Sequence, residues 1–217
     1  MKLLLTSGGL TNKTICKALS DLIGTSKSKI NVAYIPTAAN VEDGSKEWLI
    51  NDLSNIKDQG YPVDIVDISA VDKDIWLPRL KKADVIFFGG GNTFYLMSWL
   101  RKSGLDKLLP ELLKTRVYVG ISAGSIVATI NLRMSSSQKS YSEKVFPLQN
   151  DKGLGFVIFH VRPHLNSRYF PRLKVKNLAK IAKDIPETVY AIDDNSAVVV
   201  NGKEVKVVSE GKWVKFN

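Results

Sequence analysis

The sequence contains only one cysteine and two histidines among 217 residues. Cys16 therefore has no partner for an intrachain disulfide, and no cysteine cluster exists that would hold a structural metal. Two histidines are also too few for a histidine-rich metal site. We expect neither a metal nor a cofactor, and any catalytic imidazole must belong to His160 or His164.

Long hydrophobic runs are lacking as well. The strongest apolar stretches, such as residues 85–88, span a handful of residues, whereas a membrane-spanning helix needs about 20. The first residues carry one lysine and too short an apolar stretch for a signal peptide, so we interpret residues 2–6 as a buried strand. These features predict a cytoplasmic protein with no membrane partner.

Acidic residues are outnumbered by basic ones, 21 against 31, which gives a formal net charge of +10. Such an excess can indicate nucleic-acid binding. The basic residues are scattered, however, with groups at 101–102, 174–183 and 203–215. Neither an RRM signature nor a zinc-finger spacing accompanies them. We therefore expect no nucleic-acid partner and interpret the charge as a solvated surface able to attract acidic substrates.

Strand-like and helix-like patterns alternate over the first half of the chain. The predicted strands are residues 2–6, 29–35, 63–68, 85–88 and 116–119, and the predicted helices are residues 11–23, 42–59, 72–82, 93–101 and 106–114. This alternation is typical of βαβ crossovers and predicts an α/β fold, with a mostly parallel sheet covered by helices on both faces.

The second half of the chain turns β-rich. A strand is expected at residues 154–159 and a basic helix at 172–183. The predicted C-terminal strands are residues 189–192, 197–200, 204–209 and 213–216. Asn201-Gly202 is a typical hairpin turn, so a C-terminal β-hairpin is expected. No linker-like segment or internal repeat interrupts the sequence, which predicts one domain over residues 1–217.

The segment Gly120-Ile121-Ser122-Ala123-Gly124 directly follows the apolar run at residues 117–119. A G-x-S-x-G sequence between a strand and a helix is the pattern of a nucleophile elbow, in which two glycines permit a sharp turn and expose the serine hydroxyl. The pattern alone is weak. A serine nucleophile also needs a base, an acid that orients the base, and donors for the oxyanion.

Other predicted strand ends supply candidates for these parts. The backbone N–H of Ala123 comes just after the serine, and the glycine loop at residues 89–91 ends a neighbouring strand. We expect Gly90 and Ala123 to donate to an oxyanion, since bare glycine backbone approaches a substrate closely. A competing interpretation of the glycine loop is a phosphate site at a helix N-terminus, although the lysine of a P-loop is missing.

The base and the acid each have two candidates. His164 follows Pro163 just after a predicted strand, so its ring is expected at the strand edge, whereas His160 lies within or at the end of that strand. Asp193 and Asp194 end the strand at residues 189–192 and offer the orienting carboxylate. A plain turn explains the same Asp-Asp-Asn sequence, so the residue types leave these choices open.

Three motifs of this sequence resemble, in their order and spacing, those of the peptidase E family: residues 88–94, 120–124 and 163–164. This family of serine peptidases includes aspartyl dipeptidase and is related to cyanophycinase. The similarity runs from the first strand to about residue 200. The resemblance implies a fold like that of class I glutamine amidotransferases, which is flavodoxin-like, with Ser122 as the nucleophile and His164 as the base. Asp193 matches the family's acid, at a point where family members often have Pro-Glu-Gly-Asn. Because aspartate is shorter than that glutamate, Asp194 is the fallback.

The resemblance also implies a substrate class. It suggests a dipeptidase or aminopeptidase-like enzyme that hydrolyses short peptides, with N-terminal aspartate as the possible preference. Arg172, Arg168 and Asn92 are the candidate substrate-binding residues, since arginine pairs well with a carboxylate. Aspartyl dipeptidases carry an aspartate where this chain has Ser135-Ser136-Ser137. That departure supports an alternative, a non-catalytic or regulatory protein that binds an acidic metabolite or peptide. A monomer or homodimer is expected.

Overall fold

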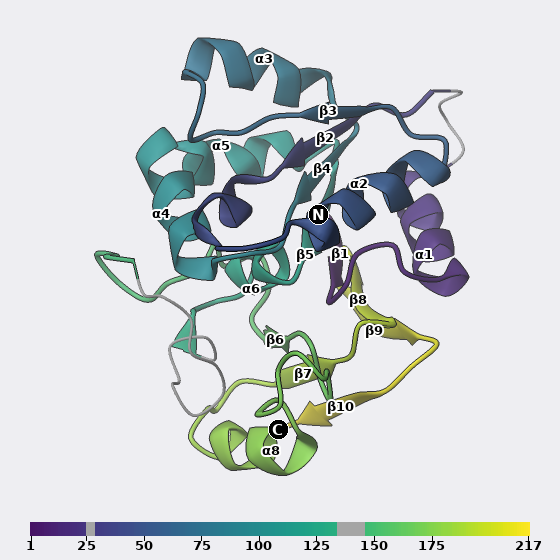
Figure 1. Cartoon of the computed structure of the whole chain (residues 1–217), viewed down its shortest axis with the longest axis vertical. Coiled ribbons are helices and arrows are strands. Elements are labelled where there is room, and N and C mark those ends of the chain that lie inside the picture. The colour runs from purple at the N-terminus through teal and green to yellow at the C-terminus, as the bar shows by residue number, and fades with distance from the viewer. Residues whose placement is uncertain (25–28, 134–145) are drawn as a thin grey trace.

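The computed structural model describes residues 1–24, 29–133 and 146–217. Its larger sheet has seven strands in the order β3-β2-β4-β5-β1-β8-β9 (Figure 1). These strands are β1 (Lys2–Thr6), β2 (Val32–Ile35), β3 (Val63–Ile65), β4 (Val85–Phe88), β5 (Val117–Ile121), β8 (Ser196–Asn201) and β9 (Glu204–Ser209). Strands β3, β2, β4, β5 and β1 are parallel. The prediction of a mostly parallel sheet is confirmed.

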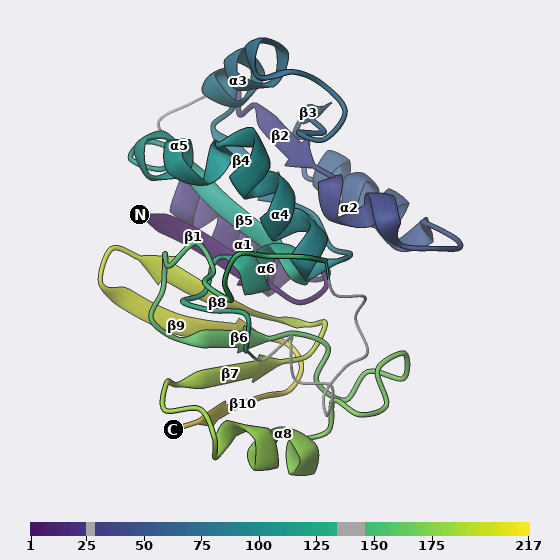
Figure 2. The same cartoon turned by 90° about the vertical axis from the view of Figure 1, so that its left-hand side faces the viewer.

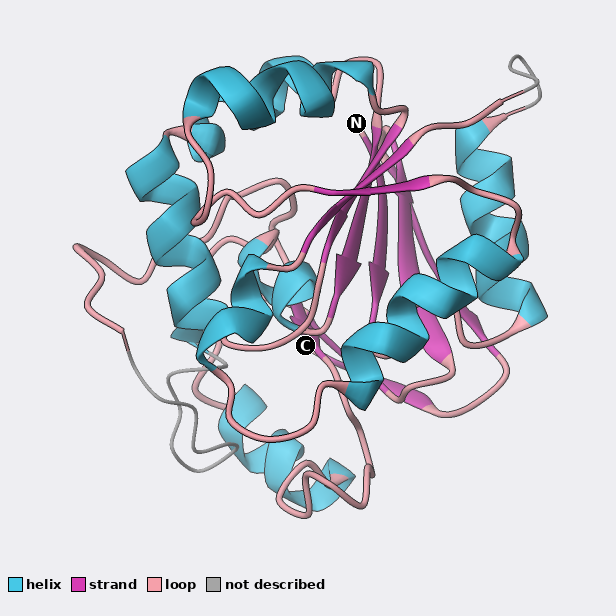
Figure 3. Ribbon diagram, turned by 45° about the horizontal axis from the view of Figure 1, so that its top comes forward, coloured by secondary structure: helices cyan, strands magenta, loops and turns pink. Residues whose placement is uncertain are grey.

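The helices cover both faces of the larger sheet (Figure 3). They are α1 (Lys13–Ile23), α2 (Glu47–Asp58), α3 (Lys73–Lys82), α4 (Thr93–Ser103), α5 (Leu105–Leu112) and α6 (Ala123–Val127), with a short 3-10 helix, η1 (Thr37–Val41). Alternating strand residues face opposite layers. Leu3 and Leu5 pack with α3 to α6, whereas Leu4 packs with α1 and α2. No helix in the described ranges is long and apolar enough to cross a membrane.

A second sheet has three strands in the order β10-β7-β6. These strands are β6 (His160–Arg162), β7 (Val189–Ile192) and β10 (Trp213–Phe216). The basic helix α8 (Val175–Ala182) packs beneath this sheet through Leu178 and Ile181 (Figure 2). Strands β8 and β9 form the expected C-terminal hairpin in the larger sheet. The chain then crosses to the smaller sheet, which the sequence did not predict because a short strand does not reveal its partner.

The predicted strand at residues 154–159 is wrong. Its backbone amides do not join a sheet but bind carbonyls at the end of α6: Leu154 N–H donates to Val127 O (2.7 Å) and Phe156 N–H to Ala128 O (3.0 Å). Gly155 has a positive φ of 69° that breaks an extended run. The apolar segment therefore covers the helix terminus, and the strand begins only at His160.

Candidate active site

The C-terminal ends of three neighbouring strands meet at one edge of the larger sheet. The order β4-β5-β1 places the glycine loop, Ser122 and Ser7 next to one another. Strands β6 and β7 of the smaller sheet are also parallel neighbours, and their ends lead to His164 and Asp194. Candidate active-site residues therefore come from two sheets.

The backbone of Ser122 adopts the strained conformation of a nucleophile elbow. Its φ of 49° and ψ of −106° lie in a region of backbone conformation that residues other than glycine rarely adopt. The turn is fastened to β1, because Ser122 N–H donates to Thr6 O (3.1 Å). A Cβ on Gly120 would lie 2.6 Å from the carbonyl carbon of Gly124, and one on Gly124 would collide with the carbonyl oxygen of Phe88. Both glycines are therefore required by close backbone approach.

The imidazole of His164 lies between a hydroxyl and a carboxylate. Its Nε2 is 2.8 Å from Ser122 Oγ, and its Nδ1 is 2.7 Å from Asp194 Oδ1. Phe170 stacks on the ring, with the centroids 4.5 Å apart. This arrangement allows Nε2 to accept the serine proton while the carboxylate accepts from Nδ1–H. Of the two histidines, the structure brings His164 to the elbow.

The carboxylate beside His164 belongs to Asp194, and the expectation for Asp193 is corrected. Asp193 accepts hydrogen bonds from Ser196 Oγ (2.6 Å) and from the backbone N–H groups of Asn195 and Lys212. These donors hold the Asp193 side chain within the turn that joins β7 to β8. Adjacent side chains diverge here, so the fallback Asp194 occupies the place beside the imidazole.

The pKa of Asp194 is lowered from its ordinary value. Burial by itself raises this pKa, but hydrogen bonds from His164 and Ser7, together with the charge of the imidazole, outweigh the burial. The carboxylate therefore stays ionised at neutral pH. A negative charge at this place stabilises the imidazolium that forms when His164 takes a proton.

Gly90 and Ala123 both lie beside Ser122. A Cβ on Gly90 would be 3.5 Å from Ser122 Cβ and 3.5 Å from the Trp48 ring. Ala123 is the first residue of α6, where a backbone N–H has no acceptor within the helix. The two residues expected at an oxyanion hole are thus brought together next to Ser122, with Trp48 as a neighbouring wall.

The second histidine lies elsewhere. His160 is 1% exposed on β6, and its Nε2 is 3.5 Å from Glu187 Oε2. Burial lowers its pKa, although the charge of Glu187 opposes the shift. His160 is therefore a packed residue of the smaller sheet.

The hydrogen bonds of the His164 ring do not involve the three residues expected to bind substrate. Asn92 is 1% exposed and caps α4, with its Oδ1 accepting from Tyr95 N–H (3.0 Å), so the structure gives it a capping role and its contact with substrate stays a prediction. Arg168 and Arg172 are exposed. The Arg168 guanidinium lies over the Tyr169 ring, 4.7 Å from the centroid. The serine-rich stretch at residues 135–137 lies outside the described residues.

A buried acid lies beneath the glycine loop. Asp52 is 7% exposed, and its Oδ2 accepts from Tyr34 Oη (3.3 Å). A Cβ on Gly89 would be 2.5 Å from the same Tyr34 oxygen, so this pair supports the loop directly. Burial raises the pKa of Asp52 from 3.8 to about 7, against the hydrogen bond from Tyr34.

The raised pKa of Asp52 predicts a pH-dependent stability. The unfolded chain loses this proton near pH 3.8, while the folded protein keeps it to about pH 7. The folded state is therefore progressively destabilised as pH rises through this window, and the cost is complete above it. Asp52→Asn removes the titration, so the Tm of the variant should rise relative to wild type between pH 4 and pH 8. A difference in Tm that does not vary with pH would contradict this.

Asp67 is a matched control, for which the change of stability with pH has the opposite sign. Asp67 has a lowered pKa, because hydrogen bonds from Asn40, Ser69 and Thr37 outweigh the burial that raises it. Its contribution to stability is present above the unfolded pKa and lost as pH falls. Asp67→Asn should therefore lose Tm relative to wild type as pH rises towards the ordinary pKa of 3.8, with little further change at higher pH.

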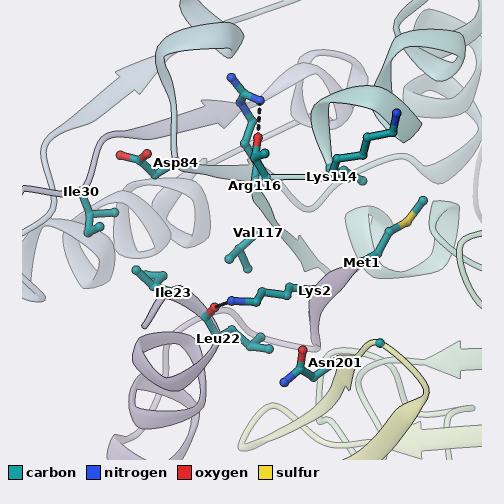
Figure 4. A pocket seen from close by; sticks show the side chains of 13 residues that line it. Met1, Lys2, Leu22, Ile23, Ile30, Asp84, Lys114, Arg116, Val117 and Asn201 are labelled. Atoms are coloured by element: carbon teal, nitrogen blue, oxygen red, sulfur yellow. Dashed lines mark hydrogen bonds between the residues drawn. The ribbon is translucent and has the colours of Figure 1, made fainter. Parts of the chain in front are cut away.

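A separate cavity lies at the opposite edge of the larger sheet. Its volume is about 520 Å³, and Figure 4 shows Lys2, Arg116 and Val117 around it. These residues are at the N-terminal ends of β1 and β5, whereas Ser122 follows the C-terminal end of β5. Lys2 is engaged, since its Nζ donates to Leu22 O (2.7 Å). The cavity is therefore remote from the elbow.

Comparison with known proteins defines the class. The family model described as peptidase family S51 matches residues 3–208. The chain belongs to this family and is a peptidase. An uncharacterized peptidase of Listeria monocytogenes is 31% identical over 175 residues, covering 80% of this chain and 83% of the relative. Peptidase E of a Nostoc species is 26% identical over 208 residues, covering 89% and 81%.

Solved structures agree with this assignment. The crystal structure of a Listeria monocytogenes protein provisionally named peptidase E has a TM-score of 0.78 and 27% identity, covering 97% of this chain and 98% of that chain. A peptidase from an acI-B1 Actinobacterium shares the fold, with a TM-score of 0.74 and 23% identity over 98% and 88% of the two chains. The resemblance to peptidase E is confirmed.

Proposed function

We propose that the chain is a serine-type peptidase that hydrolyses short peptides through an acyl-enzyme on Ser122. The observation that carries the proposal is the continuous line of contacts from Ser122 Oγ through the His164 ring to Asp194 Oδ1, at 2.8 and 2.7 Å. A serine, an imidazole and a carboxylate at these distances have the geometry of an activated nucleophile.

The proposed reaction has two halves. His164 Nε2 accepts the Ser122 proton as Oγ attacks the peptide carbonyl, and the amides of Gly90 and Ala123 stabilise the oxyanion. His164 then gives the proton to the leaving amine, and the C–N bond breaks. Water next attacks the ester with His164 as the base, which releases the acid product and restores the serine. Asp194 holds the proton on Nδ1 throughout.

We further propose that the preferred peptides carry an acidic first residue. The formal net charge of +10 favours the approach of acidic substrates. Arg168 and Arg172 come soon after His164 and remain the candidate partners for a substrate carboxylate. This preference rests on the net charge of the chain and on the positions of these two exposed arginines after His164.

Kinship with the class I glutamine amidotransferase fold, of flavodoxin-like type, is also proposed. Its support is the parallel sheet with a nucleophile elbow between β5 and α6. One domain, a cytoplasmic location, and a monomer or homodimer are part of the same proposal. The single cysteine fits a reducing compartment.

A serine-directed fluorophosphonate probe tests the proposed function. We expect one covalent adduct on the folded protein, located by mass spectrometry on the peptide that contains Ser122, because the activated Oγ displaces fluoride from phosphorus. Ser122→Ala is the control and should remain unlabelled. A folded wild-type protein that resists the probe would overturn the enzyme mechanism and favour the non-catalytic alternative, in which the same site binds an acidic metabolite or peptide.

A further inference from the structure

Ser7 has a buried hydroxyl and directly follows the interior strand β1, and the mechanism above gives it no role. It is fully buried. Its Oγ donates to Asp194 Oδ1 (2.6 Å) and accepts from His164 N–H (2.8 Å). The same oxygen is 3.3 Å from His164 Nδ1. One side chain of the larger sheet thus contacts both the acid and the base carried by the smaller sheet.

Residues that follow Ser7 in the chain bind the turn between β7 and β8, which carries Asp194. Thr11 Oγ1 donates to Asp194 O (2.7 Å), and Asn12 Nδ2 donates to Asn195 O (3.0 Å). Gly8 lies so close that an added Cβ would be 3.2 Å from both Asp194 O and Asp194 Cβ. The loop after β1 is therefore fitted against the turn that carries the acid, and Ser7 is its contact with the carboxylate.

We propose that Ser7 is a positioning residue of the catalytic centre, whose hydroxyl fixes the Asp194 carboxylate and the His164 backbone relative to each other. The proposal rests on the proposed serine-peptidase function. Ser7 touches no reacting atom; it acts through Asp194 and His164.

The hydrogen-bonding capacity of a serine explains why this residue suits the place. A hydroxyl has one proton to donate and lone pairs to accept with. The proton goes to Asp194 Oδ1, so the backbone N–H of His164 is satisfied by a lone pair. This leaves the proton on Nδ1 for the carboxylate. The Asp194 side chain is 45% exposed, so loss of Ser7 removes one of the two donors, Ser7 and His164, that hold Oδ1 against competition from water.

The backbone at His164 needs the same contact. His164 has a φ of 62°, in the left-handed region that side chains rarely adopt. Its N–H bond to Ser7 and the bond from Leu165 N–H to Ile192 O (3.0 Å) hold this conformation. Loss of the Ser7 oxygen removes one of these supports at the residue whose ring must face Ser122.

The experiment compares Ser7→Ala with Ser196→Ala. Ser196 is a matched control, since it is fully buried and its Oγ donates to Asp193, the neighbouring carboxylate that does not contact the imidazole. We expect Ser7→Ala to lower kcat/KM for a short peptide by about 10- to 100-fold, mainly through kcat, because a hydrogen bond to a charged group is lost. The kcat/KM of Ser196→Ala should stay within a few-fold of wild type, even where its loss of Tm equals that of Ser7→Ala.

The pH profile separates positioning from general destabilisation. The Ser7 donor stabilises the charged Asp194 carboxylate, so its loss should move the acid limb of kcat/KM to higher pH. Ser7→Thr keeps the hydroxyl and should restore most of the activity. Ser7→Cys, nearly the same size with a weak donor, replaces Ser7→Ala if that variant does not fold. Unchanged kcat and an unchanged acid limb in a folded Ser7→Ala or Ser7→Cys variant would overturn the proposal.

The two proposals fail in different ways. If wild-type protein does not react with a fluorophosphonate at Ser122, the serine-peptidase function fails. If wild type reacts and Ser7→Ala reacts at the same rate with the same pH dependence, only the role of Ser7 fails. A slow reaction in Ser7→Ala and a normal one in Ser196→Ala support both.

Discussion

Ser122→Ala is expected to abolish peptide hydrolysis, lowering kcat/KM by roughly 10³- to 10⁶-fold. The variant keeps the site and its oxyanion donors but has no atom that can form the acyl bond. Steady-state rates on a panel of short peptides, including ones that begin with aspartate, measure the loss. Thermal unfolding checks that the elbow still folds, because alanine must adopt the same φ of 49°.

A folded Ser122→Ala variant that retains activity would show that another group performs the chemistry. Replacement of the proposed base gives an independent check. The imidazole of His164 lies 2.8 Å from the Ser122 hydroxyl, so replacing His164 should lower kcat/KM nearly as much as replacing Ser122. In residues that act as one unit, the losses are not additive. A double variant should therefore be about as inactive as either single variant.

Asp194→Asn is expected to lower kcat/KM by roughly 10²- to 10⁴-fold, while Asp193→Asn leaves it within a few-fold of wild type. An asparagine beside Nδ1 cannot hold the imidazole in the tautomer that leaves Nε2 free to accept a proton. The neighbouring Asp193 binds Ser196 Oγ and the Lys212 backbone, so its replacement should reduce Tm more than catalysis. The two variants have identical chemistry one residue apart, which makes them matched.

Comparison of the Asp193→Asn and Asp194→Asn variants identifies which aspartate orients His164. Kinetics and thermal unfolding of both variants, measured side by side, separate a catalytic effect from a structural one. A larger catalytic loss in Asp193→Asn than in Asp194→Asn, at comparable stability, would restore the original expectation from the family pattern and contradict the geometry seen here.

Local patterns predicted much of the fold. Alternating apolar runs and helical spacing located β1, β4 and β5, because each strand buries both faces between helices. The β8–β9 hairpin followed from its turn residues. The segment at residues 154–159 misled, because an apolar run that covers a helix end looks like a buried strand. The smaller sheet also escaped prediction, since strand pairing is set by distant segments.

The sequence by itself predicted a sharp turn at Ser122, because two glycines around a serine after a strand permit the close backbone approach that an elbow needs. The resemblance to the peptidase E family added His164. Only the tertiary structure showed that Asp194 and not Asp193 lies beside the imidazole, since the direction of each carboxylate depends on donors from other parts of the chain. It alone brought Ser7 to Asp194, a contact between residues 187 positions apart. Local geometry is written in neighbouring residues, whereas the orientation of an acid is set by whatever the fold packs against it.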